Sequence, residues 1–317
     1  MKAKFWGCRG SLPSTFNKDI SEKKVRKILE KAIEDKICNP EQIDGFIENL
    51  PFALRSSYGT NTSCVQIIGG NEVVICDAGS GLRDLGKELV KLGPLMPKTI
   101  HILMSHLHWD HIQGFPFFIP AYFQGVAIKI YGCHDTIESA FREQQNEPTF
   151  PVQLRDMGSE ISFHKLLIDK TFDIGGIEIS IIEQPHPGLS YGYKFIKDGK
   201  TIVYSTDAEH TEESQSDDYP YLDFIRGCDL LIFDGQFNLA DHMYTKQNWG
   251  HSSNLVGIEL AIRGHVKQLC LFHSDHTFSD FDLDKFLKDS LRYREIYDDS
   301  SDLDIMIGYD GLEIDLS

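Results

Sequence analysis

No run of apolar residues in this sequence approaches the length of a membrane-spanning helix. No apolar leader is present either, because Met1-Lys2-Ala3-Lys4 runs directly into a strand-like segment at 2–8. C-x-x-C pairs are absent, and the seven cysteines are an odd number, several of them inside apolar runs, such as Cys76 and Cys270. These absences argue against a membrane protein, a secreted protein and a disulfide framework, and they predict a soluble cytoplasmic protein whose cysteines are reduced core residues.

Basic residues are scarce relative to acidic ones. The sequence has 31 Lys and Arg against 48 Asp and Glu, which gives a formal net charge of −17. Binding of a long polyanion depends on many Lys or Arg contacts to phosphate, so we do not expect long nucleic acid as a partner. A small anion bound at one locally positive site remains compatible with this charge.

Internal repeats and low-complexity linkers are also missing. A length of 317 residues, with 41% hydrophobic and 25% charged residues, suits one large globular domain spanning 1–317. Predicted strands and helices interleave along the chain, with hairpins around Gly69-Gly70-Asn71 and Asp198-Gly199. This order favours mixed sheets covered by helices over an all-parallel barrel.

Residues 16–57 have the pattern of a helical pair inserted into this domain. Apolar residues from Val25 to Ile37 follow the spacing of one helical face, Asn39-Pro40 begins a second helix, and Pro51 ends it. The simplest interpretation is a hairpin packed on the domain edge. A lid over the functional site and a contact between two copies of a homodimer are the alternatives.

The most informative stretch is Ser105-His106-Leu107-His108-Trp109-Asp110-His111, directly after the apolar run 99–104. In an extended segment, residues i, i+2 and i+4 point to one side, so His106, His108 and Asp110 lie together if the strand geometry continues. His111 joins them only if the chain turns there. Imidazole and carboxylate suit zinc and related divalent metals, and the H-x-H-x-D-H order favours a metal site over an ordinary polar loop.

Further donors stand at the ends of other predicted strands, where sheets hold side chains rigidly. His186 lies in QPHPG, Asp207 in STDAEH and His273 in LFH. Asp77 is either a turn or capping residue, or it orients a metal-bound histidine. His251 precedes the predicted helix 254–263 and has either a capping or a catalytic role.

These motifs together resemble the metallo-β-lactamase superfamily of dinuclear metallohydrolases, over nearly the whole chain up to Tyr309-Asp310-Gly311. The resemblance implies an α+β fold, a four-layer αββα sandwich of two mixed β-sheets flanked by helices. It implies two divalent metal ions, the first held by His106, His108 and His186, the second by Asp110, His111 and His273, with Asp207 bridging both. Zinc is the expected metal, and the residue types suit manganese as well. Members of the superfamily often have a proline soon after the last histidine, whereas this chain continues His273-Ser274-Asp275-His276. His276 therefore either competes as a ligand or lies in the outer shell of the site.

The motif Gly250-His251-Ser252-Ser253 resembles the ribonuclease Z-like phosphodiesterase branch of that superfamily, whose small-substrate members include cyclic nucleotide phosphodiesterases. The resemblance implies that His251 donates a hydrogen bond to the phosphate or protonates the leaving oxygen, and that Asp110 shares in proton handling. We therefore predict a dinuclear hydrolase of small phosphodiesters, foremost cyclic nucleotides, in which metal-bound hydroxide attacks phosphorus. The alternatives are a ribonuclease Z-like RNA 3′-processing endonuclease and a carboxylic ester or lactone hydrolase on the same centre.

Overall fold

The computed structural model describes residues 1–237 and 249–317. The first sheet contains β1 (Lys2–Gly7), β3 (Cys64–Ile68), β4 (Val73–Cys76), β5 (Thr99–Leu103), β6 (Ala127–Gly132), β7 (Glu160–Lys165) and β16 (Glu313–Asp315). The second sheet contains β8 (Phe172–Ile174), β9 (Ile177–Gln184), β10 (Ser190–Lys197), β11 (Lys200–Ser205), β12 (Leu230–Asp234), β13 (Gln268–Phe272) and β15 (Asp304–Ile307). A two-stranded ribbon pairs β2 (Arg9–Gly10) with β14 (Ser274–Asp275).

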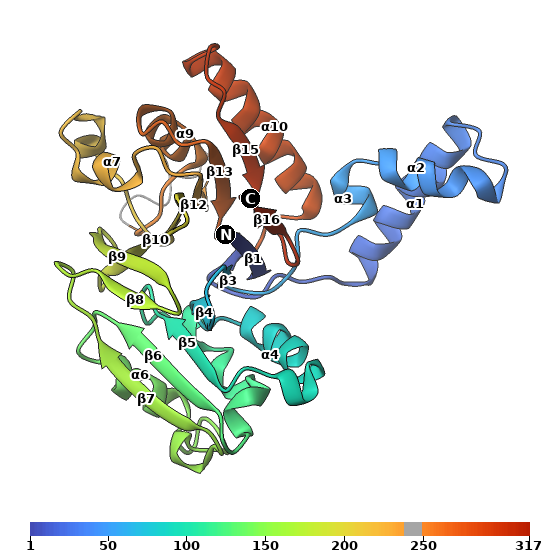
Figure 1. Ribbon diagram of the computed structural model, residues 1–317. Coiled ribbons are helices and arrows are strands. Elements are labelled where there is room, and N and C mark those ends of the chain that lie inside the picture. Colours follow the sequence, from blue (N-terminus) through green and yellow to red (C-terminus); the bar gives the residue numbers. More distant parts are fainter. Residues whose placement is uncertain (238–248) are drawn as a thin grey trace.

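Both sheets are mixed. The first has the order β16-β1-β3-β4-β5-β6-β7, in which β3 and β4 are antiparallel and β4 to β7 are parallel. The second has the order β15-β13-β12-β11-β10-β9-β8, in which β11, β12, β13 and β15 are parallel and the other neighbours are antiparallel (Figure 1). Parallel neighbours end at the same edge of a sheet, so loops that follow different strands meet there.

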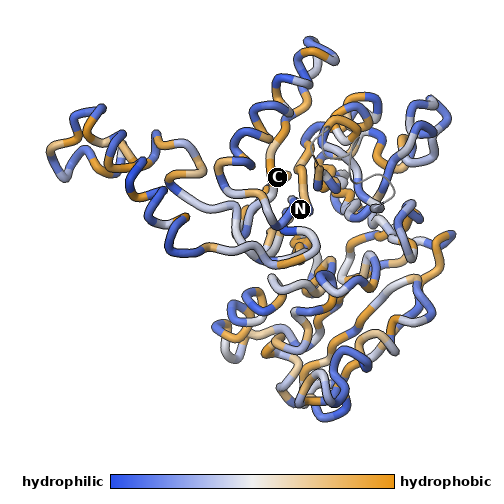
Figure 2. The backbone as a smooth tube through the Cα atoms, turned by 180° about the vertical axis from the view of Figure 1, so that it is seen from behind, coloured by the Kyte–Doolittle hydropathy of each residue, from blue (hydrophilic) through white to orange (hydrophobic). Residues whose placement is uncertain are grey.

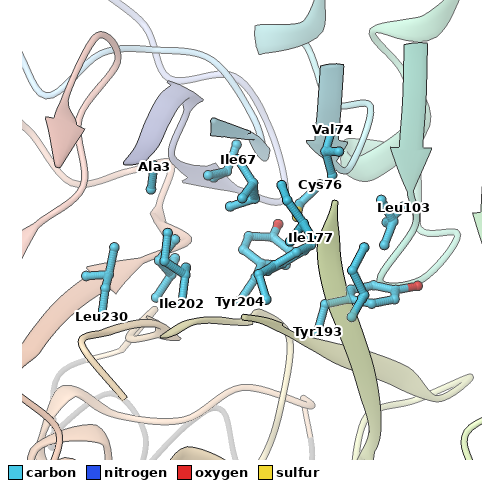
Figure 3. Close-up of a cluster of buried hydrophobic side chains, with 14 of the residues drawn as sticks. Ala3, Ile67, Val74, Cys76, Leu103, Ile177, Tyr193, Ile202, Tyr204 and Leu230 are labelled. Atoms are coloured by element: carbon cyan, nitrogen blue, oxygen red, sulfur yellow. The ribbon is translucent and has the colours of Figure 1, made fainter. Parts of the chain in front are cut away.

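The space between the two sheets is filled by apolar side chains from both of them (Figure 3). Ile67 and Val74 come from the first sheet, and Ile177 and Ile202 come from the second. Buried positions alternate along β9 from Ile177 to Ile181, as expected for a strand with one face on the core. By contrast, β12 is buried at all five positions because helices cover its other face.

Helices cover the outer faces of both sheets. The described residues form the helices α1 (Lys18–Glu34), α2 (Ile43–Asn49), α3 (Phe52–Arg55), α4 (Gly81–Lys91), α5 (Trp109–Ile112), α6 (Ile137–Gln144), α7 (Pro220–Ile225), α9 (Asn254–Arg263) and α10 (Asp280–Tyr297), not all of which lie on a sheet. Leu85 of α4 packs in one cluster with Ile102 of β5, and Ile258 of α9 and Leu283 of α10 pack in another with Leu231 of β12. The layers therefore follow the order αββα, and the predicted four-layer α+β fold is confirmed.

The predicted helical pair at 16–57 forms helices that extend away from the sheets (Figure 1). Asn17 caps α1 by accepting a hydrogen bond from the Ile20 amide at 3.1 Å. A single 3₁₀ turn, Pro40–Gln42, precedes α2, and Asn39 caps this turn. That these helices are an insertion into one domain stays a prediction.

One predicted loop differs from the structure, and a second lies mostly outside the described residues. The acidic composition of 211–221 predicts a solvated loop, but this stretch contains a 3₁₀ turn and the start of α7. Pro220 begins α7, and Tyr221 and Ile225 of this helix are buried. The sequence also predicts a loop at 234–248, most of which lies outside the described residues. Among the described helices, none is both long and apolar enough to cross a bilayer.

Candidate metal centre

The functional side chains lie just beyond the carboxyl ends of strands from both sheets. In the first sheet, Asp77 follows β4 and the segment 105–111 follows β5; these two strands are parallel neighbours. In the second sheet the site residues are His186 after β9, Asp207 after β11, Asp234 at the end of β12 and His273 after β13. The site therefore lies where the edges of the two sheets meet, and each sheet contributes donors.

The first trio, His106, His108 and His186, lies around one side of Asp207. One donor atom from each of these four residues lies within 4.8 Å of the others. His186 Nε2 is 3.1 Å from His108 Nδ1, and His106 Nε2 is 3.5 Å from Asp207 Oδ2. The buried His106 Nε2 has no hydrogen-bond partner. The structure thus brings together the residues that the family resemblance assigns to a first metal ion.

The second trio, Asp110, His111 and His273, lies on the other side of Asp207. Its donor atoms also lie within 4.8 Å of one another. His273 Nε2 is 3.2 Å from both His111 Nε2 and Asp110 Oδ2. Asp207 Oδ1 is 3.3 Å from His111 Nε2 and 3.4 Å from His273 Nε2. Because Oδ2 of the same carboxylate faces the first trio, Asp207 has the geometry of a bridging ligand.

These donors fit divalent metal ions. Nitrogen and oxygen atoms converge without sulfur, and an unpartnered buried imidazole nitrogen such as His106 Nε2 is costly unless something occupies the space it faces. Burial lowers the pKa of His106, His108 and His186, which favours the neutral imidazole that ligates metal. Burial alone would raise the pKa of Asp207, but His273, His111 and His106 hold it well below its usual range.

Asp110 and His111 reach the second trio by a helical turn. The β5 strand ends at Leu103, and the His111 amide donates to the His108 carbonyl at 3.0 Å as α5 begins. The extended alternation of His106, His108 and Asp110 is therefore wrong, because helical hydrogen bonding replaces the strand before Asp110. The turn expected at His111 begins two residues earlier, at Trp109.

Three site residues leave their strands with left-handed backbone conformations. The φ angles of Asp77, Asp207 and His273 are 60°, 52° and 59°. Asp and His are among the non-glycine residues that adopt this region most readily, and such residues often lie at functional sites. Gly10 lies against the His273 ring so closely that a Cβ added there would be 2.5 Å from Nδ1.

Asp77 contacts the second trio directly. Its Oδ2 lies 2.8 Å from His111 Nδ1 and accepts hydrogen bonds from Tyr204 Oη at 2.6 Å and Ser105 Oγ at 2.8 Å. Its Oδ1 accepts the Ser105 amide at 2.7 Å. Of the two interpretations of Asp77, this geometry fits the one in which it orients a metal-ligating histidine, while its backbone also makes the turn.

His251 has a partner that the sequence did not reveal. Asp234 Oδ2 lies 2.9 Å from His251 Nδ1, and the ring nitrogen is 3.8 Å from Asp207 Oδ2. Burial alone would lower the pKa of His251, but Asp234 raises it to about 9. Ser253, whose Oγ accepts the Val256 amide at 3.4 Å, caps α9, so His251 is free of the capping role. The only sequence signal for Asp234 is its place at the end of an apolar strand.

Other polar residues near the motifs lie outside the two trios. His276 keeps 35% of its side chain exposed, with Nδ1 3.8 Å from Asp275 Oδ1, and it belongs to none of the donor groups of the described residues. His210 is buried, with Nδ1 2.7 Å from Tyr219 Oη. Glu209 accepts the Gly250 amide at 2.8 Å. Glu209 thus supports the loop that carries His251.

Comparisons with known proteins agree with this geometry. A family model described as a beta-lactamase superfamily domain matches residues 72–274. Ribonuclease Z from Picrophilus torridus is 22% identical over 278 residues, covering 71% of this chain and 84% of that protein. The fold resembles the metallo-beta-lactamase fold protein YhfI from Bacillus subtilis (TM-score 0.64, 18% identity, 99% and 98% of the two chains). It also resembles yeast PDE1 (TM-score 0.60, 16% identity, 82% and 96%).

The family model covers well over half of the chain, including all the donors in both trios and Asp207. The predicted enzyme class, a metal-dependent hydrolase related to the phosphoric diester hydrolases, is confirmed. The chain therefore belongs to the metallo-β-lactamase superfamily.

Proposed function

We propose that this protein is a dinuclear metal-dependent phosphodiesterase that hydrolyses small phosphodiesters, foremost cyclic nucleotides. The first trio would hold one ion, the second trio the other, and Asp207 would offer one carboxylate oxygen to each. When bound, two such ions supply Lewis acidity and lower the pKa of a coordinated water. Zinc and manganese both suit these nitrogen and oxygen donors.

The pairing of His251 with Asp234 carries this proposal. Because Asp234 engages Nδ1 of the ring at 2.9 Å, Nε2 is the nitrogen that can face a substrate. From there it donates a hydrogen bond to a phosphoryl oxygen or a proton to the leaving ribose oxygen. A leaving alkoxide needs that proton, and carboxylic ester or lactone hydrolysis, the third candidate, makes less use of it. Asp110 shares in proton handling at most secondarily, since its Oδ2 already accepts the Ser11 amide at 2.8 Å.

The net charge of the chain indicates whether its substrate is a small phosphodiester or a long nucleic acid. A net charge of −17 disfavours a long polyanion and leaves a single phosphodiester as the better match. The second candidate is RNA 3′-end processing, which is favoured by the similarity to ribonuclease Z over 84% of the Picrophilus protein. A reducing, cytoplasmic location is part of the proposal, supported by the seven free cysteines, six of which are buried.

A substrate panel tests the proposal. Protein purified without chelator is assayed with 3′,5′-cyclic nucleotides, bis(p-nitrophenyl) phosphate, a transfer-RNA precursor and a lactone, and its metal content is measured. Asp207→Asn, which removes charge from the bridging carboxylate, serves as the metal-deficient control. We expect turnover of the first two substrates, and loss of it in the control. Turnover confined to the precursor would establish the second candidate instead, and turnover confined to the lactone the third.

A further inference from the structure

Arg9 is a buried cation that the proposed chemistry does not use. It belongs to β2, the short strand that follows β1, and only 2% of the residue is exposed. Figure 2 shows the N-terminus in the middle of the molecule, beside the C-terminus, so β2 is not part of a loose chain end. A buried guanidinium costs free energy unless its donors have partners, so the contacts of Arg9 indicate what the charge is for.

The guanidinium of Arg9 joins β2 to two other segments of the chain. Its Nε donates to the Gly59 carbonyl at 2.9 Å, ahead of β3. Its Nη1 donates to the Phe278 carbonyl at 2.9 Å and to the Asp275 carbonyl of β14 at 3.4 Å. Its Nη2 lies 3.8 Å from Asp280 Oδ1, at the start of α10. A planar fork of donors contacts several carbonyls at once, a geometry that the point charge of a lysine does not reproduce.

The backbone of β2 meets the second trio from two directions. On one side β2 pairs with β14, which directly follows His273, and a Cβ added at Gly10 would lie 2.5 Å from Nδ1 of that ring. The Ser11 amide, next along the chain, donates to Asp110 Oδ2 at 2.8 Å. On the other side the strand forms a β-bridge with Thr62, whose Oγ1 donates to the Asp110 carbonyl at 2.7 Å. Two of the three donors of the second trio are thus held by β2 and its neighbours.

The first trio is held by other segments. His186 Nδ1 lies 2.7 Å from the Gly250 carbonyl, ahead of α9. His106 Nδ1 lies 3.1 Å from Ser105 Oγ, just after β5. These contacts involve none of the segments that Arg9 joins to β2. A change at Arg9 should therefore affect the second metal ion and spare the first.

We propose that Arg9 is a positioning residue for the second metal ion, because its guanidinium holds β2 against β14 and β2 in turn fixes His273 and Asp110. This inference rests on the proposed two-ion centre. Arg9 acts through the backbone, and neither an ion nor a substrate needs to contact it. Without the guanidinium, part of the free energy of metal binding is spent on ordering β2, so the second ion binds more weakly.

Titration of the metal-free protein with Co²⁺, followed by visible absorption and by metal analysis, tests the proposal. The two sites should differ in their spectra, because the first trio has three imidazoles and the second has two. Arg9→Met removes the donors and keeps an unbranched side chain. It should weaken binding of the second ion by at least roughly tenfold and leave binding of the first unchanged. Arg9→Lys, which keeps the charge without the fork, should bind the second ion with intermediate affinity.

Two controls separate positioning from loss of charge and from loss of stability. Lys24→Met removes a second buried cation, which is ion-paired with the same Asp280 but donates to the Ser56 carbonyl at 2.7 Å and not to β14. Leu85→Ala shortens a buried side chain of α4 and should lower the free energy of unfolding, as measured with urea on the metal-free protein. Both variants should bind two ions with the affinities of the wild-type protein.

The outcomes distinguish this inference from the two-ion centre on which it rests. Wild-type affinity for the second ion in Arg9→Met, or an equal loss of that ion in Lys24→Met or Leu85→Ala, would overturn the role of Arg9 and leave the two-ion centre in place. If Arg9→Met does not fold, wild-type affinity for the second ion in Arg9→Lys would overturn it in the same way. A wild-type protein that binds a single ion would overturn both.

Discussion

Asp77 Oδ2 lies 2.8 Å from His111 Nδ1, so a carboxylate at the end of β4 orients a ring of the second trio. A carboxylate in this position fixes which ring nitrogen faces the metal and raises the basicity of the ligand. The remaining contacts of Asp77, to Ser105 and Tyr204, hold the carboxylate itself in place. Metal affinity should therefore depend on a residue that does not touch the metal.

Replacing Asp77 with Asn should weaken metal binding roughly 10- to 100-fold, because the amide loses the charge that supports His111. Asn tolerates the left-handed backbone of this position, so the fold should persist. Competition with a chromogenic chelator measures the affinity. Asp229→Asn is the matched control: Asp229 is buried before β12 and accepts the Thr201 amide at 2.8 Å, far along the strand from the site. Equal affinities in the two variants would contradict the assignment of Asp77.

Replacing His251 with Ala should slow turnover of a ribose ester by roughly 10²- to 10⁴-fold while metal content stays unchanged. The loss should be smaller for bis(p-nitrophenyl) phosphate, because nitrophenolate leaves without being protonated. Steady-state kinetics on both substrates give the comparison. Asp234→Asn should show the same dependence on the leaving group in weaker form, since the ring loses its anchor. An equal loss on both substrates would assign His251 a role other than proton donation.

Replacing Gly10 with Ala should disturb the second trio selectively. The added Cβ would lie 2.5 Å from His273 Nδ1, so either the ring or β2 must move. We expect the number of bound ions per chain to fall from two towards one, as measured by elemental analysis after gel filtration. Gly45→Ala is the control, because a Cβ at Gly45 in α2 meets nothing within 4 Å. Retention of two ions in Gly10→Ala would show that the ribbon of β2 and β14 shifts to accommodate the added Cβ without loss of metal.

Removal of metal should lower the melting temperature by several degrees. Each trio combines donors from the first sheet with a histidine from the second, so bound ions connect the two sheets. Ligands that bind only the folded state stabilise it by about 2.7 kcal/mol at a free concentration 100 times the dissociation constant. Differential scanning calorimetry with chelator, and then with zinc or manganese restored, measures the effect. The same melting temperature in all three conditions would argue against ions that link the sheets.

Asp310 should make the protein less stable as the pH rises from about 4 to above 6. Burial raises the pKa of this carboxyl to about 6, although Oδ2 accepts the amides of Thr60 and Asn61. The folded state therefore holds the proton more tightly than the unfolded state, and the stability that the proton contributes is lost as the pH passes through 6. A shift of this size corresponds to at most about 3 kcal/mol.

The substitution Asp310→Asn should remove this pH dependence and stabilise the protein at pH 8, because an amide keeps the acceptor and cannot ionise. Urea unfolding at pH 5 and pH 8 compares the variant with the wild-type protein. Asp315→Asn is the control, because it removes an exposed carboxylate. Asp315 is ion-paired with Lys2, and this pairing lowers the pKa of Asp315 to about 2. A wild-type stability that rises between pH 5 and pH 8, with no difference in Asp310→Asn, would refute the role of Asp310.

The sequence predicts donors at strand ends because they follow apolar runs, whereas the division of these donors between two ions is implied by the resemblance to the superfamily. His106, His186 and His273 are all recognisable in this way, although the third lies 167 residues from the first. It does not predict that Asp234 holds His251, because that contact joins residues from separate elements across a loop. Nor does it predict that Asp110 stands on a helical turn, because H-x-H-x-D matches a period of two as readily as a turn. Such choices depend on tertiary hydrogen bonds, which a local pattern does not contain.

The left-handed backbone at Asp77, Asp207 and His273 restricts how this centre can be redesigned. A β-branched side chain is strained in that conformation, and long carboxylates such as Glu would have to reach the same point from a sharper bend. Attempts to change metal preference by exchanging Asp207 or His273 are thus confined to the few residue types that tolerate the turn. Main-chain geometry and coordination chemistry thus both favour Asp and His at these positions, and a change to one would require rebuilding the backbone where the strand ends.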